Sequence, residues 1–375
     1  MATIVLLTTL HPRSDPRIFV KEARTLAART PHKVFLMVAD GQGSMEDRQA
    51  RVSIHDLGRL GGGRGFRAWA GPWRAFWAIG RIKPDVVHFH DPELIPLGLM
   101  LRALGCKIVY DVHEDVPRQI LSKRWLPRWV RKPVACVMSA AEWFGARAFS
   151  AIVPATPKIA ERFPAGKTVL IQNFPILEEM FSSEAIPYRE RPSSFAYVGV
   201  ITEDRGAVEM VRACDALGEM AGAKLELAGE LSPAGLEETL RALSGWALVH
   251  YHGQVSRARV GQILGRVRAG LVLFRPLPNH IDAQPNKIFE YMAVALPVVA
   301  SDFPLWRRII DGAGCGLLVD PLNPRAIAEA MRWIVDHPAE AEAMGERGRQ
   351  AVERTYNWNT EAVTLINLYN KLLAA

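Results

Sequence analysis

The sequence lacks several features that would assign it at once to a well-defined class of protein. Its four cysteines are scattered over 375 residues without a Cys-x-x-Cys pair, so a reduced cytoplasmic setting fits better than a disulfide framework. No apolar run reaches the roughly 18 residues that a membrane-spanning helix needs. No Gly-x-Gly-x-x-Gly motif follows a predicted strand, which argues against a nicotinamide-dependent dehydrogenase.

The composition of the chain allows two folded domains with an anionic partner. Its 375 residues correspond to about two domains of ordinary size, and the 49% of apolar residues are enough for two hydrophobic cores. The net charge of +7 suggests phosphate, a membrane surface or nucleic acid as a partner. Because the chain shows neither a recognition helix nor zinc-finger spacing, we expect no nucleic acid partner.

Short β-rich runs alternate with helical patterns along most of the chain. The runs of the first half are Thr3–Leu7, Lys33–Val38, Asp85–Phe89, Lys107–Tyr110, Ala151–Val153 and Thr168–Ile171. A polar segment at Ser182–Ser194 interrupts this pattern, and a second series begins at Phe195–Val198. The alternation predicts the α/β class, with two facing Rossmann-like doubly wound domains and a ligand cleft between them.

The segment Ile281–Asp302 carries the most specific chemistry. Two carboxylates, Asp282 and Glu290, flank seven residues, and the pattern predicts a helix over Asn286–Ala295 and then a strand. A helix N-terminus suits a phosphate, and carboxylates accept hydrogen bonds from sugar hydroxyls, so the segment fits a sugar nucleotide. The alternative is an ordinary βα unit with a charged residue at the helix start.

A second candidate phosphate site lies at Phe195–Gly206. Gly199 follows the predicted strand and would allow close approach of the backbone to a ligand, and Arg205 would offer a guanidinium fork to a diphosphate. The alternative for Arg205 is a solvated helix residue.

The first half offers polar residues at predicted strand ends. Asp15 and Arg17, in the loop after the first strand, could contact an acceptor or the donor phosphates. His88 lies within a strand and is more typical of a buried core histidine. A rival metal site, for zinc or iron, would combine imidazoles and carboxylates from two strand ends. Its candidate ligands are His88, His90, Asp91, His113 and Asp115.

Two basic, tryptophan-containing segments, Arg59–Lys83 and Arg124–Lys132, contain no acidic residue. Trp69, Trp73 and Trp77 recur every four residues of the first segment. Such clusters are typical of contact with a membrane surface, whereas the plain alternative buries the tryptophans in the core. Because Pro72 disrupts a helix interior, we expect the reliable helix to begin near it.

The chain resembles the retaining glycosyltransferases of family 4, which have the GT-B fold, and especially bacterial enzymes of surface-polysaccharide assembly. The segments that carry the resemblance are HPRSDPRIFVKEARTL, VYDVHEDVPRQIL, Asn173-Phe174-Pro175, the acid-x7-acid block, ASDFPLWRRII and GCGLLVDPLNP. The resemblance implies an acceptor-side domain over 1–185, a nucleotide-sugar domain over 186–355 and a helix over 356–375 that crosses back to the first domain.

The resemblance also assigns roles to residues. Asp282 would hold donor-sugar hydroxyls, Glu290 the ribose hydroxyls, and His113 would lie near the reacting sugar. Arg205, Lys287 and helix N–H groups near Ile288 would stabilise the leaving diphosphate. The chain departs from the family pattern at Val200, where the family has an arginine that Lys287 could replace, and at Asp282, where it usually has glutamate.

The sequence therefore predicts sugar transfer from a UDP-, GDP- or ADP-sugar to a saccharide or lipid-linked acceptor, in polysaccharide or glycolipid assembly. No Asp-x-Asp motif occurs, and we expect neither a metal nor another cofactor. We expect a cytoplasmic protein, peripheral on the inner face of the plasma membrane. The alternatives are a sugar-nucleotide epimerase of the same fold, a metallohydrolase and a non-catalytic polysaccharide-binding protein.

Overall fold

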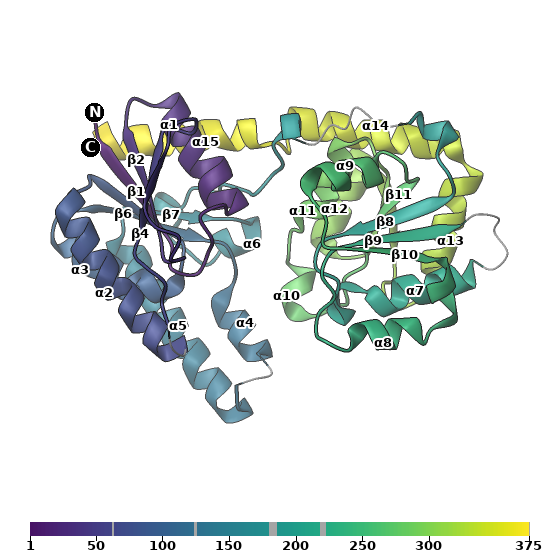
Figure 1. Ribbon diagram of the computed structural model, residues 1–375, viewed down its shortest axis with the longest axis horizontal. Coiled ribbons are helices and arrows are strands. Elements are labelled where there is room, and N and C mark those ends of the chain that lie inside the picture. Colours follow the sequence, from purple (N-terminus) through teal and green to yellow (C-terminus); the bar gives the residue numbers. More distant parts are fainter. Residues whose placement is uncertain (62–63, 124–125, 180–185, 218–222, 375) are drawn as a thin grey trace. The chain divides into compact units, whose positions relative to one another are not determined.

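The computed structural model describes residues 1–61, 64–123, 126–179, 186–217 and 223–374 (Figure 1). The chain forms two compact units. The N-terminal unit comprises Met1–Asn173 and Trp358–Ala375, and the C-terminal unit comprises Phe174–Asn357. Each unit has its own sheet with helices on both faces, so the predicted α/β class with two Rossmann-like domains is confirmed.

The N-terminal unit is built on a seven-stranded sheet in the order β3-β4-β2-β1-β5-β6-β7. All neighbouring strands are parallel except β3 and β4. The central strands β1 and β5 are almost entirely buried and mostly apolar, as expected for strands covered on both faces. The strands are β1 (Thr3–Leu7), β2 (Lys33–Val38), β3 (Met45–Asp47), β4 (Val52–Asp56), β5 (Val86–Phe89), β6 (Lys107–Val112) and β7 (Ala151–Pro154).

Two groups of helices cover this sheet. The core between the sheet and α2, α3 and α5 contains Val5, Val87 and Phe89 from the strands. The C-terminal helix α15 contacts η1 and α1 of the same unit. The helices are η1 (Pro16–Ala23, a π-helix), α1 (Arg24–Arg29), α2 (Arg64–Ile82), α3 (Ile95–Ala103), α4 (Val116–Ser122), α5 (Arg128–Ala148), α6 (Pro157–Ala160) and α15 (Trp358–Ala374), with short 3-10 turns η2 (Pro92–Leu94) and η3 (Ala165–Lys167).

Two local predictions for this unit are wrong. Helix α2 begins at Arg64 and continues through Pro72, so the proline lies inside the helix and does not mark its start. The segment Thr168–Ile171 forms no strand, although it runs beside β7, where the amides of Val169 and Ile171 donate to the carbonyl oxygens of Ile152 and Pro154.

The C-terminal unit is built on a six-stranded, all-parallel sheet in the order β10-β9-β8-β11-β12-β13. This order reverses between β8 and β11, as in dinucleotide-binding folds. The strands are β8 (Ser194–Val198), β9 (Lys224–Ala228), β10 (Val249–Gly253), β11 (Ala269–Val272), β12 (Val298–Ser301) and β13 (Gly316–Val319).

One continuous hydrophobic core fills this unit, with Trp306, Tyr197 and Tyr291 among its largest buried side chains. The α-helices are α7 (Ala207–Ala216), α8 (Leu236–Arg241), α9 (Arg257–Leu264), α10 (Pro278–Ile281), α11 (Asn286–Ala293), α12 (Pro304–Ala313), α13 (Pro324–Asp336) and α14 (Pro338–Arg354). The 3-10 turns are η4 (Leu177–Glu179), η5 (Tyr188–Glu190), η6 (Glu203–Arg205) and η7 (Ser244–Leu248).

The boundary between the units lies earlier than the predicted one at 185–186. Phe174 already belongs to the C-terminal unit, because its ring packs edge-on against Phe289, with centroids 4.8 Å apart. The first part of the predicted linker, 182–185, lies outside the described residues. Within the described ranges, no helix is both long enough and apolar enough to cross a membrane.

Candidate functional site

In the C-terminal unit, the first candidate site lies at the carboxyl ends of β8 and β9, next to the point where the strand order reverses. Ligands of doubly wound sheets bind at this switch point. Gly199 directly follows β8 with φ +113°, and Gly229 directly follows β9 with φ +145°. A β-carbon on Gly229 would lie 2.0 Å from the carbonyl oxygen of Gly199, so only glycine lets these two turns approach each other.

Two cationic side chains lie beside the Gly199 turn. Lys287, in the first turn of α11, lies so close that a β-carbon on Gly199 would come within 2.8 Å of its Nζ. Arg205, in η6, donates from Nη1 to the carbonyl oxygen of Val200 at 3.1 Å. Burial, and next the positive charge of Arg205, lowers the pKa of Lys287 to about 8. Two cations that repel each other beside an open glycine turn favour a bound anion.

The two predicted carboxylates lie on either side of Lys287 in the sequence. Glu290 lies on α11 with 27% of its side chain exposed, and its Oε1 is 4.0 Å from Nη2 of Arg257. Asp282 is half-buried at the C-terminal cap of α10. The prediction for Ile288 needs correction, because its amide already donates to the carbonyl oxygen of Pro285 at 3.2 Å. The first four N–H groups of an α-helix lack an acceptor four residues earlier, and the tighter bond to Pro285 already satisfies that of Ile288.

The N-terminal unit brings a second group of polar residues to the carboxyl ends of β1 and β5. Asp91 follows β5 and accepts hydrogen bonds from Oγ1 of Thr8 at 2.9 Å and from the amide of Thr9 at 2.5 Å. Asp15 caps η1 by accepting from the amides of Arg17 and Ile18. Its other carboxylate oxygen lies 3.1 Å from Nδ1 of His11, and this hydrogen bond raises the pKa of His11.

Arg17 is part of a buried network and contacts no ligand site, so its predicted role is wrong. Only 3% of the residue is exposed. Its guanidinium lies 2.9 Å from Oδ2 of Asp111 and 3.1 Å from Oε1 of Glu22. Burial alone would raise the pKa of Asp111, but the charges of Arg17 and His113 outweigh it and hold that pKa well below the usual range. Burial and the negative charge of Asp111 raise the pKa of Glu22.

This network positions His113 at the end of β6. Its Nε2 lies 3.2 Å from Oδ1 of Asp111 and 3.1 Å from Nδ1 of His90, while 19% of its side chain remains exposed. His88 is the buried core histidine that the sequence predicts, with Nδ1 2.9 Å from the hydroxyl of Tyr369 on α15. The network therefore holds Nε2 of His113, while part of the side chain remains accessible.

The predicted metal ligands do not assemble as a set. Asp91 bonds to Thr8 and Thr9, and Asp115 caps α4 and pairs with Arg162. The residues whose ligand atoms do lie within 4.8 Å of one another are Glu22, His88, His90 and Asp111. The guanidinium of Arg17 already supplies a cation to both carboxylates of that group.

Comparisons with known proteins agree with this geometry. The family model described as "Glycosyltransferase Family 4" matches residues 17–174, and the model described as "Glycosyl transferases group 1" matches residues 178–351. This chain belongs to the family 4 type of glycosyltransferase.

Known proteins match most of this glycosyltransferase in sequence or in fold. An MMP α-(1→4)-mannosyltransferase of Mycolicibacterium hassiacum is 22% identical over 310 residues, covering 77% of this chain and 71% of the relative. The structure of a sucrose-phosphate synthase from Thermosynechococcus elongatus superposes with a TM-score of 0.79 at 18% identity, covering 100% of both chains. The HepE protein of Anabaena, in complex with UDP-glucose, superposes with a TM-score of 0.75 at 12% identity, covering 99% of this chain and 100% of that one. These likenesses confirm the predicted GT-B fold.

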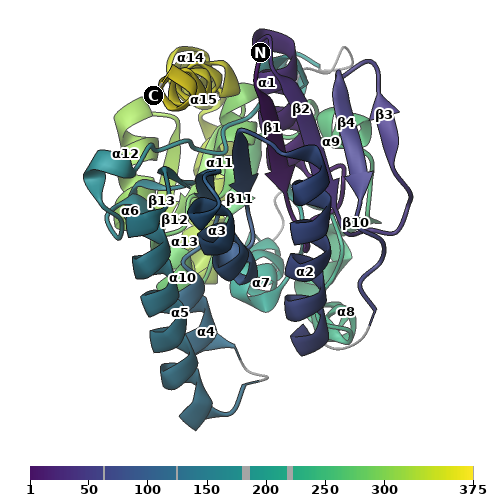
Figure 2. The same ribbon diagram turned by 90° about the vertical axis from the view of Figure 1, so that its left-hand side faces the viewer.

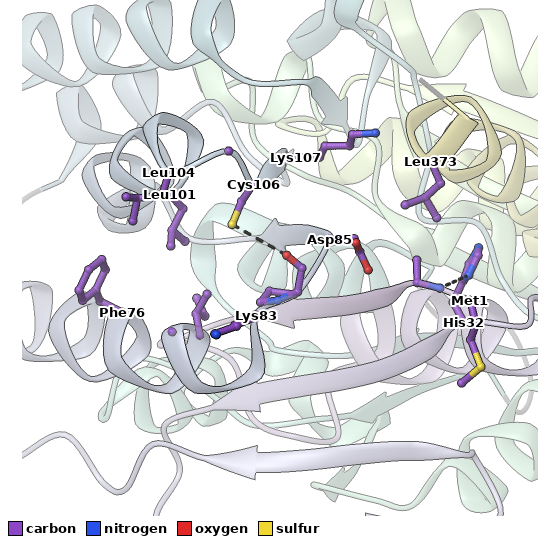
Figure 3. Close-up of a pocket in the computed structure, with 15 residues that line it drawn as sticks. Met1, His32, Phe76, Lys83, Asp85, Leu101, Leu104, Cys106, Lys107 and Leu373 are labelled. Carbon is purple, nitrogen blue, oxygen red and sulfur yellow. Dashed lines mark hydrogen bonds between the residues drawn. The ribbon is translucent and has the colours of Figure 1, made fainter.

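A cavity of about 730 Å³ in the N-terminal unit of the glycosyltransferase does not coincide with these residues (Figure 3). It is lined by Met1, Asp85 and Cys106, which precede β1, β5 and β6. It therefore lies at the amino ends of the strands, whereas ligands of such sheets bind at the carboxyl ends.

Sequence reasoning missed His11, whose side chain is 34% exposed and whose ring centroid lies 5.4 Å from that of His113. Its position just after β1, at the strand-order reversal of the N-terminal sheet, is the signal that could have identified it.

The tryptophans of α2 are exposed, so the interpretation that buries them is wrong. Trp69, Trp73 and Trp77 are 66%, 50% and 56% exposed, and their rings stack or meet edge-on along the helix. Figure 2 shows α2 and α5 flanking α3, which contacts both. We call the large, exposed apolar residues of these two helices the aromatic surface; its other members, on α5, are Trp129, Val134, Val137, Trp143 and Phe144.

Proposed function

We propose that this glycosyltransferase moves a sugar from a nucleoside diphosphate sugar to a hydroxyl of a saccharide or lipid-linked acceptor, with retention of anomeric configuration and without a metal ion. The observation that carries the proposal is the cation pair of Lys287 and Arg205 beside the bare backbone of Gly199. A diphosphate fits such a site, because its negative charge neutralises both cations and because glycine leaves room for its oxygens.

Two kinds of residue contact the donor: cations that bind its diphosphate and carboxylates that bind its hydroxyl groups. Lys287 and Arg205 neutralise the leaving diphosphate, and Lys287 compensates for Val200, whose position carries arginine in related enzymes. Glu290, on the helix, accepts from the ribose hydroxyls, and Asp282, in the loop before it, holds hydroxyls of the donor sugar. The UDP-glucose complex of the Anabaena protein, which has the same fold, supports a nucleotide sugar as the donor class.

The reaction then needs no covalent protein intermediate. The bond between the anomeric carbon and the diphosphate oxygen breaks, and the acceptor hydroxyl attacks from the face that the diphosphate leaves. The acceptor proton passes to a diphosphate oxygen. His113, held by Asp111, serves the reacting sugar as a hydrogen-bond partner. Lys287 and Arg205 contribute by stabilising the negative charge that builds on the diphosphate.

A lipid-linked acceptor agrees with the aromatic surface. Among the described side chains, eight large apolar ones are exposed on α2 and α5, and together with the basic residues Arg81, Arg128 and Lys132 they match the composition of surfaces that bind at the headgroup level of anionic membranes. We infer a cytoplasmic enzyme that associates peripherally with such a membrane and acts in polysaccharide or glycolipid assembly.

Two measurements test the proposed function. Thermal unfolding with UDP, GDP and ADP identifies the base, because a ligand of the folded state stabilises it by about 2.7 kcal/mol at a hundred times its dissociation constant. Release of the matching nucleoside diphosphate from candidate donor sugars is then followed with and without acceptor. Release that depends on acceptor supports transfer. Release without acceptor, with an altered free sugar, would instead indicate the epimerase.

A further inference from the structure

We propose that Glu226, His250 and His252 of the C-terminal unit bind a first-row divalent metal ion such as zinc, at a site separate from the donor residues. Glu226 lies on β9 and the two histidines lie on β10, the edge strand of the sheet. Their ligand atoms all lie within 4.8 Å of one another. Two imidazoles and one carboxylate form a donor set that suits zinc and its neighbours in the first transition row.

The sheet itself brings these three side chains together. His250 is the direct register partner of Glu226 across the parallel β9–β10 pair. The register shifts between Tyr251 and Gly253, so His252 is the extra residue of a bulge. A bulge redirects a side chain, and here the ring of His252 lies over that of His250, with centroids 4.2 Å apart. The strand pairing therefore fixes the positions of Glu226 and His250, and the bulge places His252 beside them.

The distances within the group are close to those of a bound ion. Oε2 of Glu226 lies 2.6 Å from Nε2 of His252 and 3.0 Å from Nδ1 of His250. Ligands at roughly 2.0–2.2 Å from zinc are about 3.3–3.6 Å apart in a tetrahedron, so Oε2 of Glu226 needs to move away by about 0.7–1.0 Å from Nε2 of His252 and by about 0.3–0.6 Å from Nδ1 of His250. His250 exposes 60% of its side chain, which leaves the remaining coordination positions open to water.

The group differs from the buried group of the N-terminal unit in one decisive respect. There, Arg17 pairs with both carboxylates and takes the place of a cation. Among the residues that the structure describes, Glu226 pairs only with the two imidazoles, and no lysine or arginine reaches it. The negative charge of Glu226 is thus available to a metal, which would tie the edge strand to β9.

Isothermal titration of zinc into the full-length, chelator-treated protein tests this inference. We expect one zinc per chain, a rise of the unfolding temperature in zinc, and no such rise in magnesium, which prefers six oxygen ligands. His250→Ala, a change at an exposed side chain, and Glu226→Gln should each weaken zinc binding at least about tenfold. His337→Ala, which removes an exposed histidine of the same unit, serves as the control and should bind zinc as the unmodified protein does.

Zinc binding that is equal in His250→Ala, Glu226→Gln and the unmodified protein would overturn the inference, because the ion would then be held elsewhere, for example in the buried group around Asp111. The absence of any zinc binding would overturn it as well. Neither result bears on sugar transfer, which uses other residues.

Discussion

The ammonium of Lys287 lies 5.2 Å from the centroid of the Tyr197 ring, and this neighbour offers it no negative charge. The phenol of Tyr197 is fully buried, and burial raises its pKa to about 12, so it stays neutral at physiological pH. Lys287 is therefore a partly desolvated cation held beside a second cation, Arg205, and it gains most when an anion binds.

The first prediction is a pH dependence of nucleotide affinity. The pKa of Lys287 is lowered to about 8, so the side chain is charged well below pH 8 and loses its proton above it. A diphosphate prefers the charged form, so the affinity should be level up to about pH 7 and then fall by up to about tenfold per pH unit above pH 8. Titration calorimetry across this range measures it. In Lys287→Met the decline above pH 8 should disappear; an unchanged decline there would assign it to another group.

The second prediction separates the two carboxylates. Glu290→Ala should weaken nucleotide binding, whereas Asp282→Ala should mainly lower turnover, because Glu290 lies on the helix beside the cations and Asp282 lies in the preceding loop. Loss of one hydrogen-bond partner should cost about 1–3 kcal/mol in each case. Steady-state kinetics and nucleotide titration of both variants provide the comparison. Full activity in the double variant would refute the assignment of both residues.

The third prediction concerns the buried pair of Arg17 and Asp111. Asp111→Asn leaves the guanidinium without its main partner, so the free energy of unfolding should fall by about 3 kcal/mol. Turnover of the folded variant should also fall, because the carboxylate that holds His113 is lost. Urea unfolding and kinetics measure the two effects. Glu237→Gln breaks an exposed pair with Arg241 and should cost less than about 1 kcal/mol. Similar losses in both variants would contradict the structural role of Asp111.

The fourth prediction places membrane contact on the aromatic surface. The protein should sediment with anionic vesicles at low salt and be released at high salt, because each basic residue near such a surface contributes about 1 kcal/mol. Trp73→Ser together with Trp77→Ser should abolish most of this binding. Val363→Ser, a change at another exposed apolar residue, on α15, should leave it intact. If the double tryptophan variant and Val363→Ser sediment equally, or if the unmodified protein does not sediment with vesicles, the aromatic surface does not bind membranes.

The sequence predicted most strands of both sheets and the glycine turn after β8, because buried parallel strands and post-strand glycines leave local patterns. The sequence could not predict that Arg17 is buried. A charged residue shortly after a strand looks like a ligand contact, and its partner Asp111 is 94 residues away in the sequence. The unit boundary at Phe174 depends on a long-range contact with Phe289, whereas the polar stretch after it only resembles a linker. Whether α2 buries or exposes its tryptophans depends on which face meets the sheet, and periodicity alone does not decide this.

The most direct test of the central claim is titration of the nucleoside diphosphate chosen by thermal unfolding into the protein in excess chelator. We predict one binding site per chain, an affinity that added Mg²⁺ leaves unchanged, and a roughly 10- to 100-fold loss in Lys287→Met, as expected for a hydrogen bond to a charged group. Lys224→Met, which removes an exposed lysine of β9, should bind as tightly as the unmodified protein. Binding that requires Mg²⁺ or Mn²⁺, or that is equal in Lys287→Met, would contradict the cation-pair account.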